Sequence, residues 1–235
     1  TLFAGLVFAP GAESFILSGA ALKLAGNLAN NSTNLQTVAL PLVLESGSRA
    51  IAAAAGDLAV SGSIGDGGND FGLTKTGANM LLLSASNSYG GAVTVNSGVL
   101  RLQHASALGG TAGGTTVSNG AALQLQGGIA TTAEPLTLNG TGVASDGVLR
   151  NISGVNSYIG AITLGTPVRI NSDAGTMTLS GGMTGAGQNL TVGGAGNITI
   201  ATAPIATTTG TLTKDGAGIV LLSARSEEHT SELQS

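Results

Sequence analysis

The feature that most constrains the fold of this chain is a set of short strand-like triplets that recur with a period of about 22 residues. In each triplet two apolar residues flank a Thr, Arg or Gln. In a β-strand the outer side chains then point to one face and the middle one to the other. The triplet at Val168 returns one such period later at Leu190, and Ile200 returns at Leu221 after an interval one residue shorter. Strands that return after a full coil run in one direction, so the spacing predicts a parallel β-solenoid.

The number of coils and the nature of the corners follow from the same spacing. Residues 1–224 contain about ten coils, which at a strand spacing of about 4.8 Å make a rod about 50 Å long. Gly and Asn between the triplets, as in SNG at 118–120, tolerate the positive φ that tight corners require. The Ala run within residues 49–58 favours a helix, but the triplet at Leu58 favours a strand. We therefore predict an all-β fold, with an antiparallel β-sandwich as the alternative.

Composition excludes several other classes of protein. Gly accounts for 39 of 235 residues, 9% of residues are charged and 42% are hydrophobic, which is unlike a disordered chain. Only five Pro occur and Gly does not recur at every third position, which excludes collagen. The net charge of −4 lacks the basic footprint of a nucleic-acid-binding protein. The absence of Cys excludes disulfides, thiolate metal sites and Cys nucleophiles.

A longer repeat links two distant parts of the chain. LTKTGANMLLLSA at 73–85 and LTKDGAGIVLLSA at 212–224 agree at nine of thirteen positions. The first copy continues into SNSYGGAVTVNSGVLRL, whereas the second copy breaks off at Ala224. We expect residues 1–224 to be one solenoid fragment of a longer region.

The last eleven residues differ from the rest of the chain. RSEEHTSELQS, at 225–235, carries four charged residues, whereas residues 1–224 carry 16. The string resembles the translation of a sequencing adapter, so we expect a non-native tail. Its polar residues are therefore not candidates for catalysis or metal binding; they are Glu227, Glu228, His229 and Glu232.

A specific pattern of residues extends over 73–102. It comprises Leu73, Thr74, Lys75, Gly77, Leu81, Leu83, Asn87, Tyr89, Gly91, Val95, Gly98, Leu100 and Leu102. This pattern resembles the core of the autotransporter-associated β-strand repeat family, LTKxGxGxLxLxxxNxYxGxTxVxxGxLxL. Val93 stands where the family has Thr, and Asn79 stands where it has a second Gly, which Gly218 supplies in the later copy. Residues 147–185 are similar to the coils between such repeats.

The resemblance implies a right-handed parallel β-helix that forms the exported part of a large bacterial surface protein. It implies a structural or adhesive passenger segment, extracellular at the cell surface after export across the outer membrane. Membrane attachment is expected only through a region outside this chain. The expected partners are host or matrix surface molecules or glycans, and no nucleic acid. A carbohydrate-active β-helix enzyme and an extracellular matrix or biofilm component are the alternatives.

The sequence has few candidates for catalysis. Glycoside hydrolysis requires a pair of carboxylates, and Glu45 and Asp66 are separated by about one coil, which permits stacking on successive turns. Two solvated corner residues are the plainer interpretation, and Arg49 alone does not supply the basic cluster of a lyase. His104 is the single His before the tail, and without a GxSxG elbow we expect it to be exposed at a strand end. We therefore expect no enzyme and no catalytic or cofactor-binding residue.

Three further segments have a plain structural interpretation. GDGGNDFG at 65–72 resembles one copy of a calcium-binding nonapeptide. Such sites need tandem copies, so we expect a polar loop and no metal site. GGTAGG at 109–114 lacks the Lys-Ser/Thr of a phosphate loop. Tyr89 and Tyr158 each end an NSY triplet, and although stacked aromatics bind sugars, we favour a role in capping a bend beside a strand.

Overall fold

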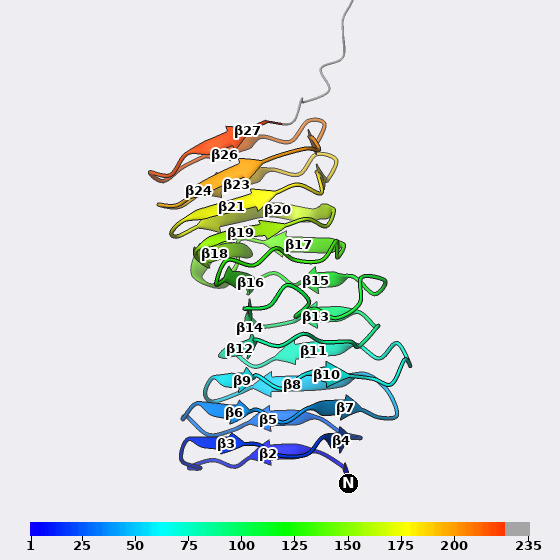
Figure 1. Ribbon diagram of the computed structural model, residues 1–235. Helices are drawn as coiled ribbons and strands as arrows, with labels where there is room; N and C mark the ends of the chain where they lie inside the picture. The colour runs from blue at the N-terminus through cyan, green and yellow to red at the C-terminus, as the bar shows by residue number, and fades with distance from the viewer. Residues whose placement is uncertain (224–235) are drawn as a thin grey trace, which may run out of the picture.

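The computed structural model describes residues 1–223, which form a parallel β-solenoid of about ten turns (Figure 1). Strands of successive turns stack in the same direction along the whole rod. The predicted all-β fold with coils of about 22 residues is thus confirmed, and the antiparallel sandwich is wrong. The proposed tail at 225–235 lies outside the described residues.

Three ladders of stacked strands run along the solenoid. The first ladder consists of β2 (Leu6–Phe8), β5 (Leu28–Asn30), β8 (Arg49–Ala53), β11 (Leu73–Thr76), β13 (Val93–Val95), β15 (Thr115–Val117), β17 (Leu136–Gly140), the start of β20 (Ile162–Ser172), β22 (Met183–Thr184) and β25 (Ile205–Ala206). The second consists of β3 (Phe15–Leu17), β6 (Gln36–Val38), β9 (Leu58–Val60), β12 (Met80–Leu83), β14 (Gly98–Leu102), β16 (Ala121–Gln126), β18 (Leu149–Ser153), the end of β20, β23 (Leu190–Gly193) and β26 (Leu212–Lys214).

The third ladder is interrupted in the middle of the rod. It begins with β1 (Leu2–Phe3), β4 (Leu22–Leu24), β7 (Leu42–Leu44) and β10 (Ile64–Gly65), and it resumes with β19 (Val155–Tyr158), β21 (Thr176–Leu179), β24 (Asn197–Ile200) and β27 (Val220–Leu222). Between β10 and β19 this side is built from loops, which still bond to one another from turn to turn, as Gly110 N donates to Tyr89 O over 2.8 Å. One short 3₁₀ helix, η1 (Val143–Ser145), lies in the loop between β17 and β18.

The core consists of columns of apolar side chains, one residue from each turn. One column runs along the second ladder through Leu58, Leu81, Leu100, Leu123, Leu149, Ile170 and Val192. None of these side chains is more than 2% exposed. Each turn therefore buries its inner face against its neighbours, as stacked coils must.

The predicted register holds at most positions and differs at one. Val168 pairs with Leu190 as the spacing predicts, but Ile200 pairs with Leu222 and not with Leu221. Leu221 and Leu222 are both apolar, so the sequence pattern does not determine which of them pairs with Ile200. The pairing of Ile198 with Val220 fixes the register. The Ala-containing segment at 49–58 forms β8, a corner and the start of β9, so the strand prediction there is confirmed.

Stacked glycines make one corner of the repeat possible. Gly77 has φ +81° and Gly98 has φ +67°, values that side chains disfavour. A Cβ on Gly77 would lie 2.2 Å from the carbonyl oxygen of Ala53, and one on Gly98 would lie 2.4 Å from that of Gly77. Successive turns approach so closely here that no side chain fits. In the described part of the chain, no helix has the length and apolar character needed to cross a membrane.

Candidate functional site

Lys75, at the third position of the LTK motif, lies inside the solenoid. It occupies the inner column of the first ladder between Ile51 and Val95, and it is 1% exposed. Its Nζ donates hydrogen bonds to three carbonyl oxygens, those of Thr76 (2.9 Å), Gly77 (2.7 Å) and Ser97 (2.9 Å). Burial lowers the pKa of Lys75 from 10.5 to about 8, against the opposing effect of the Asp57 charge. A charged residue thus replaces an apolar one in the core and joins two turns.

The second copy of the motif repeats this arrangement. Lys214 Nζ donates to the carbonyl oxygens of Asp215 over 3.1 Å and Gly216 over 2.6 Å, the same two relative positions as for Lys75. Lys214 is exposed, since it lies in the last described turn. The Lys–carbonyl geometry is therefore a local property of the LTKxG sequence.

The first NSY triplet lies on the loop side of the third ladder and is also buried. Asn87 Oδ1 accepts a hydrogen bond from Ile64 N over 2.8 Å, and its Nδ2 donates to Ala107 O over 2.6 Å. The hydroxyl of Tyr89, which is fully buried, donates to the same Ala107 oxygen over 3.2 Å. Asn87 and Tyr89 therefore connect the turn before them with the turn after them.

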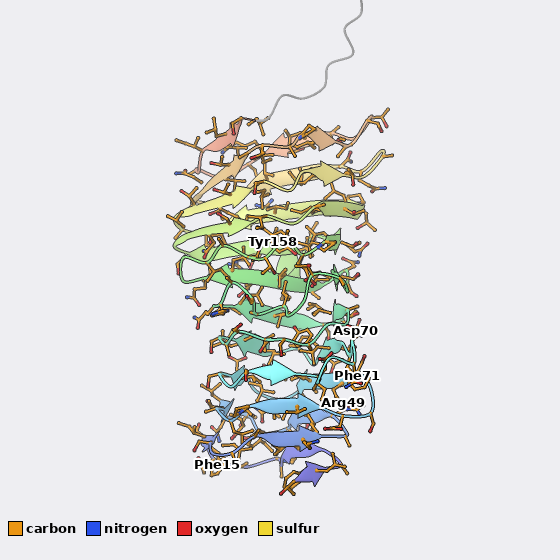
Figure 2. All side chains as sticks on the ribbon, turned by 45° about the vertical axis from the view of Figure 1, so that its right-hand side comes forward. Phe15, Arg49, Asp70, Phe71 and Tyr158 are labelled. Carbon is orange, nitrogen blue, oxygen red and sulfur yellow. The ribbon has the colours of Figure 1, made fainter. Side chains whose placement is uncertain are left out.

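The second NSY triplet, in β19, is also buried and bonds to the turn before it. Asn156 Oδ1 accepts a hydrogen bond from Ile129 N over 2.7 Å, and the Tyr158 hydroxyl donates to Glu134 O over 2.9 Å. Tyr158 is fully buried inside the rod (Figure 2), and burial raises the pKa of its hydroxyl. Both tyrosines thus stabilise bends, as we favoured, and the alternative of surface stacking on sugars is wrong because neither ring reaches solvent.

Glu134 is a buried carboxyl that the sequence did not indicate. It is 0% exposed, and its Oε1 accepts a hydrogen bond from Thr115 Oγ1 over 2.9 Å. Its Oε2 has no hydrogen-bond partner within residues 1–223. Burial raises the pKa of Glu134 from 4.5 to about 7, although the Thr115 hydrogen bond acts in the opposite direction. No spacing rule distinguishes this Glu from a corner residue, because its burial depends on the loops around it.

The structure separates Glu45 from Asp66. Because Gly65 pairs with Val43, the register does not place Asp66 opposite Glu45. Glu45 instead forms an ion pair with Lys23, with Oε1 and Nζ 2.6 Å apart. The possible stacked pair of carboxylates is therefore not formed.

Asp66 closes the loop at 65–72 from within. It is 2% exposed, so its interpretation as a solvated corner residue is wrong. Its carboxylate accepts hydrogen bonds from three backbone N–H groups, those of Gly68 (2.9 Å), Phe71 (3.0 Å) and Gly90 (3.0 Å). Burial raises the pKa of Asp66, but these hydrogen bonds outweigh burial and leave the pKa below its ordinary value. Asp70 and Phe71 mark this loop on one side of the rod (Figure 2).

His104 and Arg49 have local hydrogen-bond partners. His104 follows β14, is half-buried where we expected exposure, and accepts a hydrogen bond at Nδ1 from Ser106 N over 3.1 Å. Arg49 donates to backbone carbonyls, from Nε to Leu24 O over 3.3 Å and from Nη1 to Ser48 O over 2.9 Å. Neither side chain faces a carboxylate pair.

Most other charged side chains lie along the second ladder and pair with one another. Arg150 binds Asp173 through Nε (2.7 Å) and Asp146 through Nη1 (3.2 Å), and Arg169 binds Asp215 through Nη1 (2.6 Å). These contacts are partly exposed, so each contributes little to stability. In the described residues, no group of three or more His, Asp or Glu side chains is placed to bind a metal ion.

One of three comparisons with known proteins gives a match, and it falls on these buried residues. A family model described as passenger-associated-transport-repeat matches residues 73–102. Neither the comparison with curated proteins nor that with solved structures gives a match. The matched segment extends from β11 to β14 and contains Lys75, Asn87 and Tyr89, the buried residues that join successive turns. Residues 73–102 thus identify this chain as one that carries a repeat of the autotransporter passenger family.

Proposed function

We propose that this chain is a structural, non-catalytic segment of a surface-exposed passenger, where it serves as a stiff spacer that displays adjoining parts of the protein. The observation that carries the proposal is the burial of the family motif. Lys75, Asn87 and Tyr89 are at most 7% exposed, and each bonds to a neighbouring turn. A motif whose Lys, Asn and Tyr side chains are all used to join coils supports a building unit and leaves none of these three groups for a substrate.

The carboxylates support the same proposal. Catalytic pairs need two carboxyl groups that face one bond of a substrate. Here Glu45 and Asp173 bind basic side chains, Asp66 binds backbone N–H groups and Glu134 is fully buried. Host or matrix surface molecules or glycans remain the proposed partners of the passenger as a whole, at the cell surface.

A display experiment tests the spacer function. Cells present an epitope tag that is separated from its membrane anchor by residues 1–223, by a Gly-Ser linker of equal length, or by no spacer. We expect the solenoid to hold the tag at a nearly constant distance of about 50 Å from the anchor, because its stacked strands form a stiff rod. A Gly-Ser linker of equal length has a larger mean reach, about 80 Å, but samples a broad range of distances. The spread of distances between a label on the tag and a label on the anchor measures the difference. Equally broad spreads with the two spacers would contradict the proposal, as would cleavage of a polysaccharide by the purified chain.

A further inference from the structure

The sequence contains two Asn-Gly pairs, Asn119–Gly120 and Asn139–Gly140, and the fold places them on successive turns. The first pair follows β15 and the second ends β17, and these two strands are stacked neighbours in the first ladder (Figure 1). The side chain of Asn119 lies over Gly140, so closely that a Cβ at Gly140 would overlap Asn119 Oδ1. Two copies of one dipeptide thus occupy adjoining places at the same corner of the rod.

An Asn-Gly pair has a reaction of its own, the loss of the side-chain amide. The backbone nitrogen of the Gly attacks Cγ of the Asn, and Gly has no side chain to obstruct the approach. The new N–Cγ bond closes a succinimide ring, the Cγ–Nδ2 bond breaks, and Nδ2 leaves as ammonia with the proton that the Gly nitrogen gives up. Water then opens the ring at either carbonyl, which gives an aspartyl or an isoaspartyl residue.

Hydrogen bonds hold both reacting groups of the second pair. Asn139 Nδ2, the leaving group, donates to Val117 O over 3.0 Å. Gly140 N, the nucleophile, donates to Thr166 Oγ1 over 2.7 Å. Both residues belong to β17 and are half-buried. The nitrogen and Cγ must approach to about 3–3.5 Å before they react, so this end of β17 has to open first.

The first pair lies outside the strands. Asn119 and Gly120 are the middle residues of an exposed turn in which Ala121 N donates to Ser118 O over 3.0 Å. Within residues 1–223, the two hydrogen bonds that hold the second pair have no counterpart at Asn119 Nδ2 or Gly120 N. The space beside Gly120 is open, since a Cβ there would meet no atom within 4 Å. This turn can therefore change conformation without breaking a pairing between strands.

We propose that Asn119 is a site of spontaneous deamidation and that the fold protects Asn139, which has the same dipeptide sequence one turn later. The product carries a carboxylate in place of a neutral amide, so the modified chain gains a negative charge at the surface of the rod. The isoaspartyl form also adds an atom to the backbone of the corner. Because that corner lies between β15 and β16, the pairings of both strands should remain. The modification does not depend on the spacer function.

The test incubates the purified chain at mildly alkaline pH, where the Gly nitrogen loses its proton more readily, and follows both sites by mass spectrometry. Trypsin cleaves the unfolded chain after Arg101 and Arg150, so residues 102–150 form one peptide that contains both pairs. We expect Asn119 to react about tenfold faster than Asn139 in the folded chain. In concentrated urea, where the turns are unfolded, the two rates should become similar. A sample digested without incubation gives the background.

Two variants separate the chemistry from the structure, and circular dichroism verifies that each folds. Asn119→Gln keeps an amide but lengthens the side chain, so the five-membered ring cannot form and the reaction at this position should be lost. Thr166→Val removes the acceptor of Gly140 N but keeps a β-branched side chain. It should accelerate the reaction of Asn139 several-fold and leave that of Asn119 unchanged.

Three outcomes would overturn the proposal. The first is an equal rate at Asn119 and Asn139 in the folded chain. The second is a folded chain in which Asn119 stays intact under conditions where both residues react in urea. The third is an unchanged rate at Asn139 in the folded Thr166→Val variant, which would show that the hydrogen bond to Gly140 N does not protect this pair.

Discussion

Lys75 Nζ donates a hydrogen bond over 2.9 Å to the carbonyl oxygen of Ser97, a residue of the following turn. The same ammonium group bonds two carbonyls of its own corner, at Thr76 and Gly77. A buried ammonium group without partners would be strongly destabilising. Three short hydrogen bonds offset part of that loss, and they make Lys75 a connection between turns and not a surface charge.

Lys75→Ala should lower the free energy of unfolding by about 2–4 kcal/mol, because it removes a buried stem and leaves three carbonyl oxygens without their donor. The matched control is Lys214→Ala, in the exposed second copy, which should change stability by about 0.5 kcal/mol or less. Urea unfolding of both variants, followed by circular dichroism, measures the difference. Equal destabilisation by the two substitutions would show that Lys75 does not join the turns as described.

Lys75 should also make the free energy of unfolding depend on pH in the alkaline range. Its pKa is about 8 in the folded chain and 10.5 ordinarily, so between these values the unfolded state binds more protons. Stability should therefore rise as pH increases through this window, by about 3 kcal/mol in total. Comparing urea midpoints of the wild type and Lys75→Met across this range isolates the contribution of Lys75. A parallel pH dependence in both proteins would contradict the assignment.

Glu134 should have the opposite effect at lower pH. The folded chain holds the Glu134 proton up to a pKa of about 7, whereas the unfolded chain releases it near 4.5. Stability should fall by about 3 kcal/mol as pH rises through this window and stay level above it. Glu134→Gln keeps the size and the neutral state of the side chain, so it should remove this dependence. Thermal unfolding at a series of pH values across the window measures it; an unchanged slope in the variant would exclude Glu134 as the cause.

Asp66→Ala should loosen the loop at 65–72 without unfolding the rod. The substitution leaves the N–H groups of Gly68, Phe71 and Gly90 without their acceptor, which costs about 1–3 kcal/mol for groups that stay buried. Amide hydrogen exchange at these three residues should become faster. The control is Asp70→Asn, since Asp70 is exposed and Asn tolerates its φ of +52°. If the amide groups of these three residues exchanged equally fast in both variants, the result would contradict the role of Asp66.

The main elements of the fold were predictable because they depend on local alternation and period. Leu100 and Leu123 could be paired from their spacing. The two LTK segments, alike in sequence, also form like contacts between the Lys ammonium group and the carbonyl oxygens of its own corner. The candidate site was less predictable. The sequence places Asp66 among solvated corner residues and does not distinguish Glu134 from them, because the surroundings of both come from neighbouring turns whose loops have no regular period.

By itself the sequence determined the coil length, the parallel direction of the strands and the family of the repeat, since each is encoded by residues close together along the chain. The tertiary structure alone decided which polar residues lie inside and which surface is regular. Lys75 can be buried because the carbonyl oxygen of Ser97, on the next turn, is placed to accept a hydrogen bond from its ammonium group. Backbone hydrogen bonding between turns sets the register of the first ladder, while the loops absorb differences in coil length. The outward threonines of this ladder therefore form one column although they are unequally spaced in the sequence; they are Thr74, Thr94, Thr116, Thr137, Thr163 and Thr184.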